Sequence, residues 1–157
     1  MLLLLGDGSQ VPVTEVPGEG PWTFLVLAAS PDPPGFLARS GRVVLPDLRG
    51  RPGWGAAPGD PGFLDLVDDL DQVRTRAGLG RPVLVGLDEL APLALRAAAD
   101  QPWAWRALLL TGPAELPRLE VPALALGADP VPAVEELLGR LGPGPGWAGI
   151  APDAPPR

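Results

Sequence analysis

The sequence lacks five residue types altogether: cysteine, histidine, lysine, tyrosine and asparagine. Without cysteine, the chain can form no disulfide and offers no thiolate to a metal ion. Without histidine, it lacks the side chain that most often serves as a general base near neutral pH. Chemistry that needs a thiolate or an imidazole is therefore excluded.

Positive charge is also scarce. Every cationic side chain is an arginine, and the formal net charge is −7. Nucleic acids and anionic membrane surfaces repel an acidic chain, so neither is an expected partner. No apolar run is long enough to span a membrane, and the opening run at 1–5 is too short and uncharged for a signal peptide. We therefore expect a soluble, cytoplasmic protein.

Apolar residues, glycine and proline are abundant. Apolar residues make up 46% of the 157 residues, which is enough for a single globular domain over 1–157. The 21 glycines and 23 prolines lie mostly between apolar runs, so they are interpreted as turns rather than as a sign of disorder.

Short apolar runs alternate with stretches of helical periodicity. This alternation predicts an α/β fold in three layers, with a mostly parallel, twisted sheet and helices on both faces. Pro12 lies in the second apolar run, which predicts an edge strand there. We expect strands at 2–5, 11–16, 22–27, 42–45, 83–87, 105–111, 121–126 and 147–150, and helices at 35–40, 61–77, 91–100 and 134–141.

Several segments, taken in order, resemble the α/β-hydrolase fold family. Residues 43–50 resemble a family segment that commonly reads V-x-A-P-D-L-R-G, and Asp68-Asp69-Leu70 resembles its frequent D-D-L. The other similar segments are 81–86, 106–110, 116–124 and 127–130. In the family, a lid usually follows the strand that matches 105–111. Here only residues 112–118 separate that strand from the next similar segment, so the resemblance implies a minimal member without a cap domain.

In that family, a G-x-S-x-G turn between a strand and a helix carries the nucleophile. The matching stretch reads Gly86-Leu87-Asp88-Glu89-Leu90, so Asp88 stands at the nucleophile position. Leu90 occupies the place of a glycine, and Pro92 disfavours helix at Ala91. We therefore expect a relaxed turn with a later start of the helix.

The resemblance also assigns the remaining site positions. Asp129 matches the catalytic acid, whereas Ile150 stands where the family has histidine. The backbone N–H groups of Ala29 and Glu89 match the oxyanion hole, and the expected pocket residues are Ser30, Trp54 and Ile150. Asp32 would join Asp88, Glu89 and Asp129 in an acidic mouth, where Arg49 and Arg51 could pair with them.

These departures predict a hydrolase-like protein that has lost its Ser-His-Asp triad. It would act as a non-catalytic binding or interaction module for a small molecule or a protein, without cofactor or metal. A homodimer would cover the surface that a lid normally protects. Alternatively, the acids of the mouth are solvated loop residues that remain after the loss of catalysis. Asp68 and Asp69 are likewise expected to be solvated, on an exposed helix face.

A second hypothesis is an atypical hydrolase of the esterase or dehalogenase kind. Haloalkane dehalogenases in this family use an aspartate nucleophile, and a histidine-activated water then cleaves the ester. Here Asp88 would be the nucleophile, or would act with Asp129 as an acid–base pair. Two close carboxylates could also share a proton or bind a cation.

Overall fold

The computed structural model describes residues 1–29, 34–112, 116–127 and 130–141. Strands and helices follow one another in the predicted order. The strand expected at 147–150 lies outside the described residues. The strands are β1 (Leu2–Leu4), β2 (Gln10–Val16), β3 (Trp22–Leu27), β4 (Gly41–Pro46), β5 (Val83–Gly86), β6 (Ala107–Leu110) and β7 (Ala123–Ala125). The helices are α1 (Gly35–Ala38), α2 (Pro61–Arg76), α3 (Ala91–Asp100) and α4 (Pro130–Leu141), with the short 3₁₀ turns η1 (Asp88–Leu90) and η2 (Pro102–Ala104).

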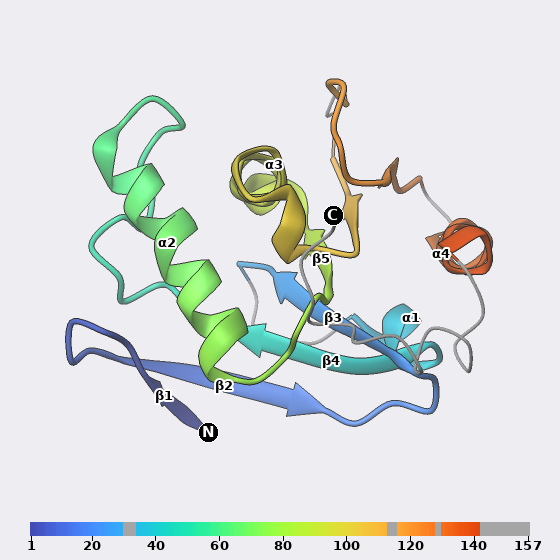
Figure 1. Ribbon diagram of the computed structural model, residues 1–157, viewed down its shortest axis with the longest axis horizontal. Helices are drawn as coiled ribbons and strands as arrows, with labels where there is room; N and C mark the ends of the chain where they lie inside the picture. The colour runs from blue at the N-terminus through green and yellow to red at the C-terminus, as the bar shows by residue number, and fades with distance from the viewer. Residues whose placement is uncertain (30–33, 113–115, 128–129, 142–157) are drawn as a thin grey trace.

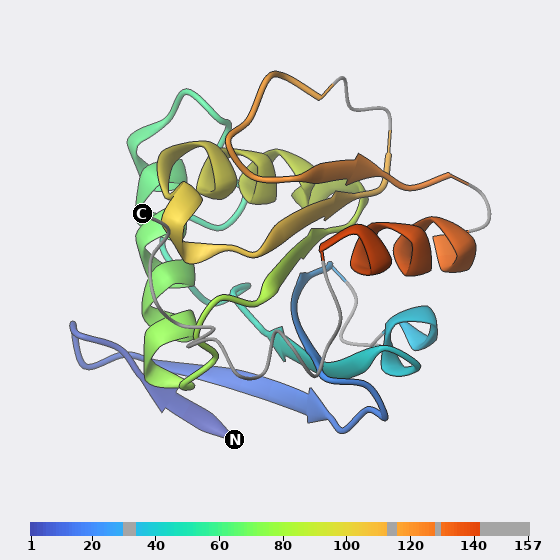
Figure 2. The ribbon, with the colours of Figure 1, turned by 45° about the vertical axis from the view of Figure 1, so that its right-hand side comes forward.

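The described strands form one seven-stranded sheet in the order β1-β2-β4-β3-β5-β6-β7 (Figure 1). Strands β4, β3, β5, β6 and β7 run parallel, and β1 and β2 are joined to them antiparallel. Helices α2 and α3 pack on one face of the sheet, and α1 and α4 on the other (Figure 2). The predicted three-layer α/β architecture is confirmed.

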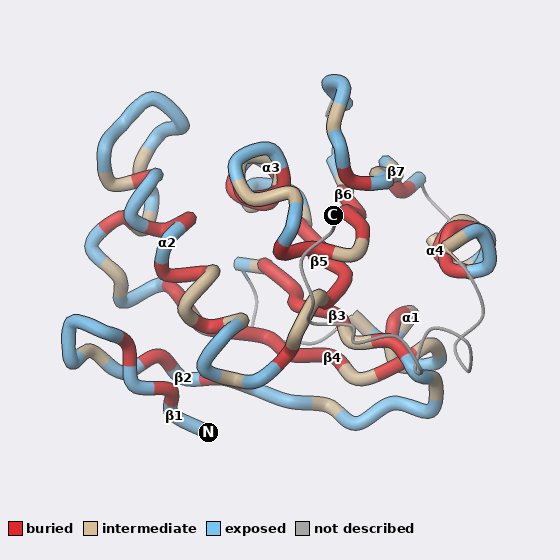
Figure 3. Tube along the Cα trace, in the orientation of Figure 1, coloured by how far each residue is buried: buried red, intermediate tan, exposed pale blue. Residues whose placement is uncertain are grey.

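The central strands are buried on both faces because helices cover both sides of the sheet (Figure 3). Alternate residues of a strand point to opposite faces. Leu25 and Leu84 therefore enter the core beneath α2 and α3. Phe24 and Val85 enter the second core, beneath α1 and α4. This arrangement explains why these strands read as continuous apolar runs.

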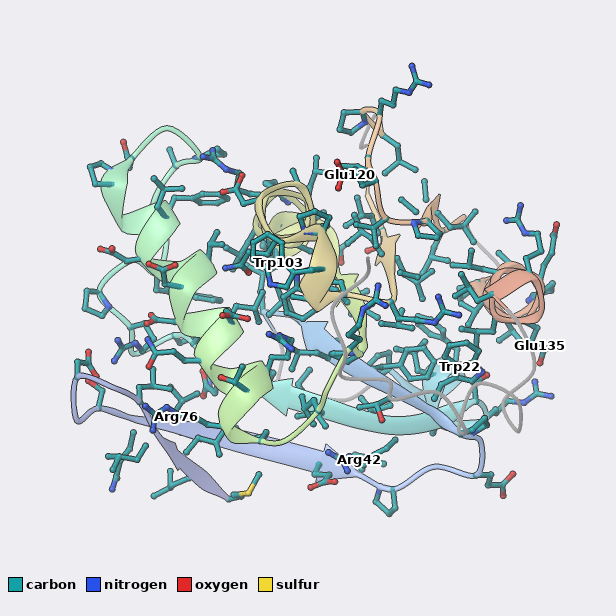
Figure 4. The ribbon with its side chains drawn as sticks, in the orientation of Figure 1. Trp22, Arg42, Arg76, Trp103, Glu120 and Glu135 are labelled. Atoms are coloured by element: carbon teal, nitrogen blue, oxygen red, sulfur yellow. The ribbon has the colours of Figure 1, made fainter. Side chains whose placement is uncertain are left out.

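Strand β2 is not the edge strand that Pro12 predicted. It lies between β1 and β4, and the short β1 forms the edge. The β2–β4 pairing begins only at Val13, so the missing N–H of Pro12 falls where the ladder ends, while its carbonyl still accepts the N–H of Asp47 at 2.8 Å. Farther along the pair, Nε of Arg42 lies 2.7 Å from a carboxylate oxygen of Glu15 (Figure 4).

Helix α2 starts at the predicted residue and ends one residue before the predicted 77, but one of its acids is not where the sequence placed it. Asp69 was expected on a solvated face, and it is only 5% exposed. Its carboxylate accepts two hydrogen bonds from the Arg51 guanidinium, at 2.9 and 3.1 Å. Arg51 also binds Asp7 in the β1–β2 turn at 2.9 Å, so one arginine joins the loop, α2 and the hairpin. A buried carboxylate is tolerated here because it is paired.

The connection between β6 and β7 limits what can cover the sheet. Residues 111–122 join β6 to β7, which is too short a segment for a cap domain between these strands.

Helix α4 starts at Pro130, before the predicted 134, because prolines are compatible with the first turn of a helix. Among the described residues, no helix has both the length and the apolar character that crossing a membrane requires.

Candidate functional site

The turn after β5 is sharp. Asp88 has a φ of 51°, and among the described residues it is the one non-glycine with positive φ. The 3₁₀ turn η1 begins at Asp88 itself, and α3 follows directly at Ala91. The relaxed turn expected from Leu90 is therefore wrong, although the α-helix proper does start beyond that residue.

Gly86 explains why the turn can close. A β-carbon at this position would lie 2.5 Å from the β-carbon of Ala94 and 3.0 Å from the α-carbon of Ala91. Helix α3 therefore packs against β5 at a distance that only glycine permits. Leu90 does not obstruct the turn, because its side chain packs against the core between α2 and α3.

The turn lies where the direction of winding changes. From β3 the chain passes to α1 on one face of the sheet, and from β5 it passes to α3 on the other face. Such a divergence between neighbouring parallel strands leaves a crevice at their carboxyl ends, where α/β proteins commonly bind ligands. Ala28 and Ala29 follow β3, while Asp88 and Glu89 follow β5, so both pairs lie at this crevice.

Thr111 holds the turn from the neighbouring strand. Its hydroxyl oxygen accepts the backbone N–H of Asp88 at 2.9 Å, and the hydroxyl donates to Oδ1 of Asp88 at 3.2 Å. Sequence reasoning did not identify this residue. Its only signal was a hydroxyl side chain directly after the apolar run of β6. Thr111 couples the Asp88 carboxylate to β6.

A pocket of about 520 Å³ opens beside the turn. Most of its wall is apolar and comes from α2, α3 and the long loop before α2, while Glu89 and Arg49 provide charge. The structure thus brings together three of the predicted site residues, Ala29, Trp54 and Glu89. The lining residues are Ala29, Arg49, Trp54, Gly55, Ala56, Phe63, Leu66, Glu89, Leu90 and Leu93.

The two arginines expected to pair with the acids of the mouth have other partners. Arg49 forms a bidentate pair with Asp47, with nitrogen–oxygen distances of 2.8 and 2.7 Å. Hydrogen bonds from Arg49 lower the pKa of the Asp47 carboxyl below its ordinary value, and Asp47 in turn raises the pKa of Arg49. Arg51 is bound to Asp69 and Asp7 instead. The sequence could not reveal these pairs, because Arg51 lies far along the chain from both Asp69 and Asp7.

The remaining predicted site residues, Ser30, Asp32, Asp129 and Ile150, lie outside the described residues. The structure therefore gives no distance between Asp88 and Asp129. Within the part of the chain that is described, no three acidic side chains gather closely enough to hold a metal ion. A smaller cavity of about 80 Å³ is also lined by Ala29, together with residues of β2 and β4.

No protein-family model and no curated protein sequence matches this chain significantly. Solved structures do. An α/β hydrolase from Sphaerobacter thermophilus matches 71% of this chain and 44% of its own, with a TM-score of 0.53 and 23% identity. An esterase from Exiguobacterium antarcticum matches 70% of this chain and 44% of its own, with a TM-score of 0.52 and 16% identity.

An N-formylmaleamic acid deformylase from Pseudomonas putida matches 71% of this chain and 45% of its own, with a TM-score of 0.53 and 22% identity. The chain thus spans less than half the length of these three structures. At these identities the likeness concerns the fold. Together with the order of the strands and the sharp turn after β5, it shows that this chain has the fold of the α/β-hydrolase superfamily.

Proposed function

We propose that this chain binds a small, mostly apolar molecule in the pocket beside Asp88 and does not turn it over. The observation that carries the proposal is the pairing of an intact turn and pocket with a chain that contains no histidine. The pocket has the apolar wall and the few polar groups that are typical of small-molecule sites. The turn and the pocket support binding, and the lack of histidine supports the absence of turnover.

Two features of the turn argue against acyl transfer. A carboxylate stands where the family has a serine, and Glu89 adds a second negative charge beside the backbone N–H groups that would have to stabilise an oxyanion. An ester formed on Asp88 would need an activated water for its cleavage. Without an imidazole, that ester would persist, and the chain would complete at most one turnover.

The alternative is an atypical hydrolase that uses Asp88 as nucleophile or, with Asp129, as an acid–base pair. The unusual backbone conformation of Asp88 and its hydrogen bond to Thr111 favour this candidate. Strained residues cluster at functional sites, because the surrounding structure must hold them in place. The same features are also expected in a protein that retained the turn only to shape a binding pocket.

Turnover assays separate the two candidates. The purified chain is incubated with p-nitrophenyl esters, a thioester and a haloalkane, and its intact mass is then measured. We expect neither product nor a change of mass. Turnover that Asp88→Ala abolishes would overturn the binding proposal, and a stable adduct on Asp88 would establish the nucleophile without turnover.

A protein partner and a homodimer are also proposed, because no cap domain lies between β6 and β7 to cover the pocket. Pull-down from native lysate with the wild type and with Asp88→Ala tests whether any partner depends on the site. A partner retained by both proteins would bind elsewhere.

A further inference from the structure

We infer that the ligand of the pocket is an organic cation, an ammonium group on an apolar body. This inference rests on the proposed function and names the chemical class of its ligand. It follows from the two charged residues of the pocket wall, Arg49 and Glu89. They differ in whether an oppositely charged side chain already pairs with them.

Arg49 is already neutralised. Its Nε and one terminal nitrogen bind both carboxylate oxygens of Asp47, so the pair brings no net charge to the pocket. An anionic ligand would have to compete with a bidentate carboxylate that is joined to the same loop. The pocket therefore does not favour an anionic ligand.

No described residue neutralises Glu89. Within the described part of the chain, its carboxylate has neither a hydrogen bond nor an ion pair, and the residue is exposed at the pocket. It lies in η1, directly before α3, where the positive end of the helix dipole favours a negative charge. Among the described residues, the side chain of the neighbouring Asp88 bonds to Thr111, which is neutral. The open charge at the pocket is thus negative.

The rest of the wall suits the body of such a ligand. Phe63 and Leu66 of α2 and Leu93 of α3 form an apolar surface, and Trp54 lines the same space. An indole attracts an ammonium group through its π electrons, while its surface also packs against alkyl or aryl groups. The overall charge of −7 draws cations toward the molecule.

The test compares three probes of matched shape: 2-phenylethylamine, 2-phenylethanol and 3-phenylpropanoate. Binding is measured by titration calorimetry near neutral pH, where the amine is protonated. We expect the amine to bind about fivefold more tightly than the alcohol, the upper range for one partly exposed ion pair, and the carboxylate to bind most weakly. High salt should reduce the preference for the amine.

Glu89→Gln keeps the shape of the side chain and removes its charge. It should abolish the preference for the amine over the alcohol. Glu136→Gln is the matched control, because it removes the same charge from the exposed face of α4, on the other side of the sheet. Circular dichroism checks that both variants fold.

The outcomes distinguish the ligand class from the proposed function. Equal binding of amine and alcohol, a preference for the carboxylate, or an unchanged preference in Glu89→Gln would overturn the cationic ligand and leave a binding pocket. Absence of binding by all three probes at millimolar concentration would contradict the proposed function itself.

Discussion

Asp88 adopts a left-handed backbone conformation that costs an L-residue free energy, with a φ of 51°. Glycine adopts this conformation without a steric penalty, whereas a β-branched residue strongly resists it. We expect Asp88→Gly to raise the free energy of unfolding by about 1 kcal/mol and Asp88→Val to lower it by at least about 1 kcal/mol. Urea unfolding measures both values. An Asp88→Gly protein less stable than the wild type would show that the carboxylate contact to Thr111 outweighs the backbone penalty.

Arg51 and Arg49 differ in what their loss leaves behind. Replacing Arg51 with methionine leaves the Asp69 carboxylate buried without a cation, and we expect a loss of about 3–5 kcal/mol in unfolding free energy. Arg49→Met breaks only a pair at the surface, so it should cost at most about 1 kcal/mol. Adding Asp69→Asn to Arg51→Met should restore part of the loss. Equal losses for the two arginine variants would contradict this.

We expect the free energy of unfolding to depend on pH through the carboxyl group of Asp7. Hydrogen bonds from the Arg51 guanidinium and from the backbone N–H of Ser9 hold its pKa well below the ordinary value. A carboxyl whose pKa is lower in the folded state stabilises the fold above its unfolded pKa of about 4, and this contribution is lost as the pH falls toward the folded pKa. Unfolding free energies measured in steps below about pH 5 should therefore fall less steeply in Asp7→Asn than in the wild type. Equal slopes would show that the ion pair is absent in solution.

Among the elements, the contact between α3 and β5 shapes the pocket. Gly86→Ala places a methyl group against Ala94 and Ala91, so we expect a loss of about 1–3 kcal/mol in stability, together with weaker ligand binding because α3 carries Leu93 into the pocket. Gly50→Ala is the control, since its added β-carbon would meet no atom within 4 Å. Thermal unfolding and calorimetry report both effects. A Gly86→Ala protein with unchanged stability and affinity would contradict the close contact.

The elements themselves could be predicted well from local pattern. Helix α2 follows from a periodic apolar stripe, with Pro61 at its start and Gly78, of positive φ, after its end. The sharp turn after β5 was not predicted, because Leu90 in the place of a glycine and the proline at position 92 both indicated a relaxed turn. The side chain of Leu90 packs against the core beneath α2 and α3, and only the tertiary structure reveals this contact.

On the scale of the whole molecule, the proposed homodimer would join two copies over their pocket faces. Sedimentation velocity over a range of concentrations measures the association. We expect Glu89→Arg, which alters the charge at the pocket, to shift the dimerisation constant, and Glu136→Arg on the opposite side of the sheet to leave it unchanged. A monomer at every concentration, or an equal effect of both variants, would remove the dimer from the proposal.

The sequence by itself determined the order of strands and helices and the exclusion of imidazole chemistry. These depend on local periodicity and on composition, which need no knowledge of distant contacts. The tertiary structure alone decided the partners of Arg49 and Arg51, the interior position of β2 and the contact of Thr111 with Asp88. Ion pairs and hydrogen bonds between distant residues depend on how the helices and strands pack, and a linear pattern does not encode that packing.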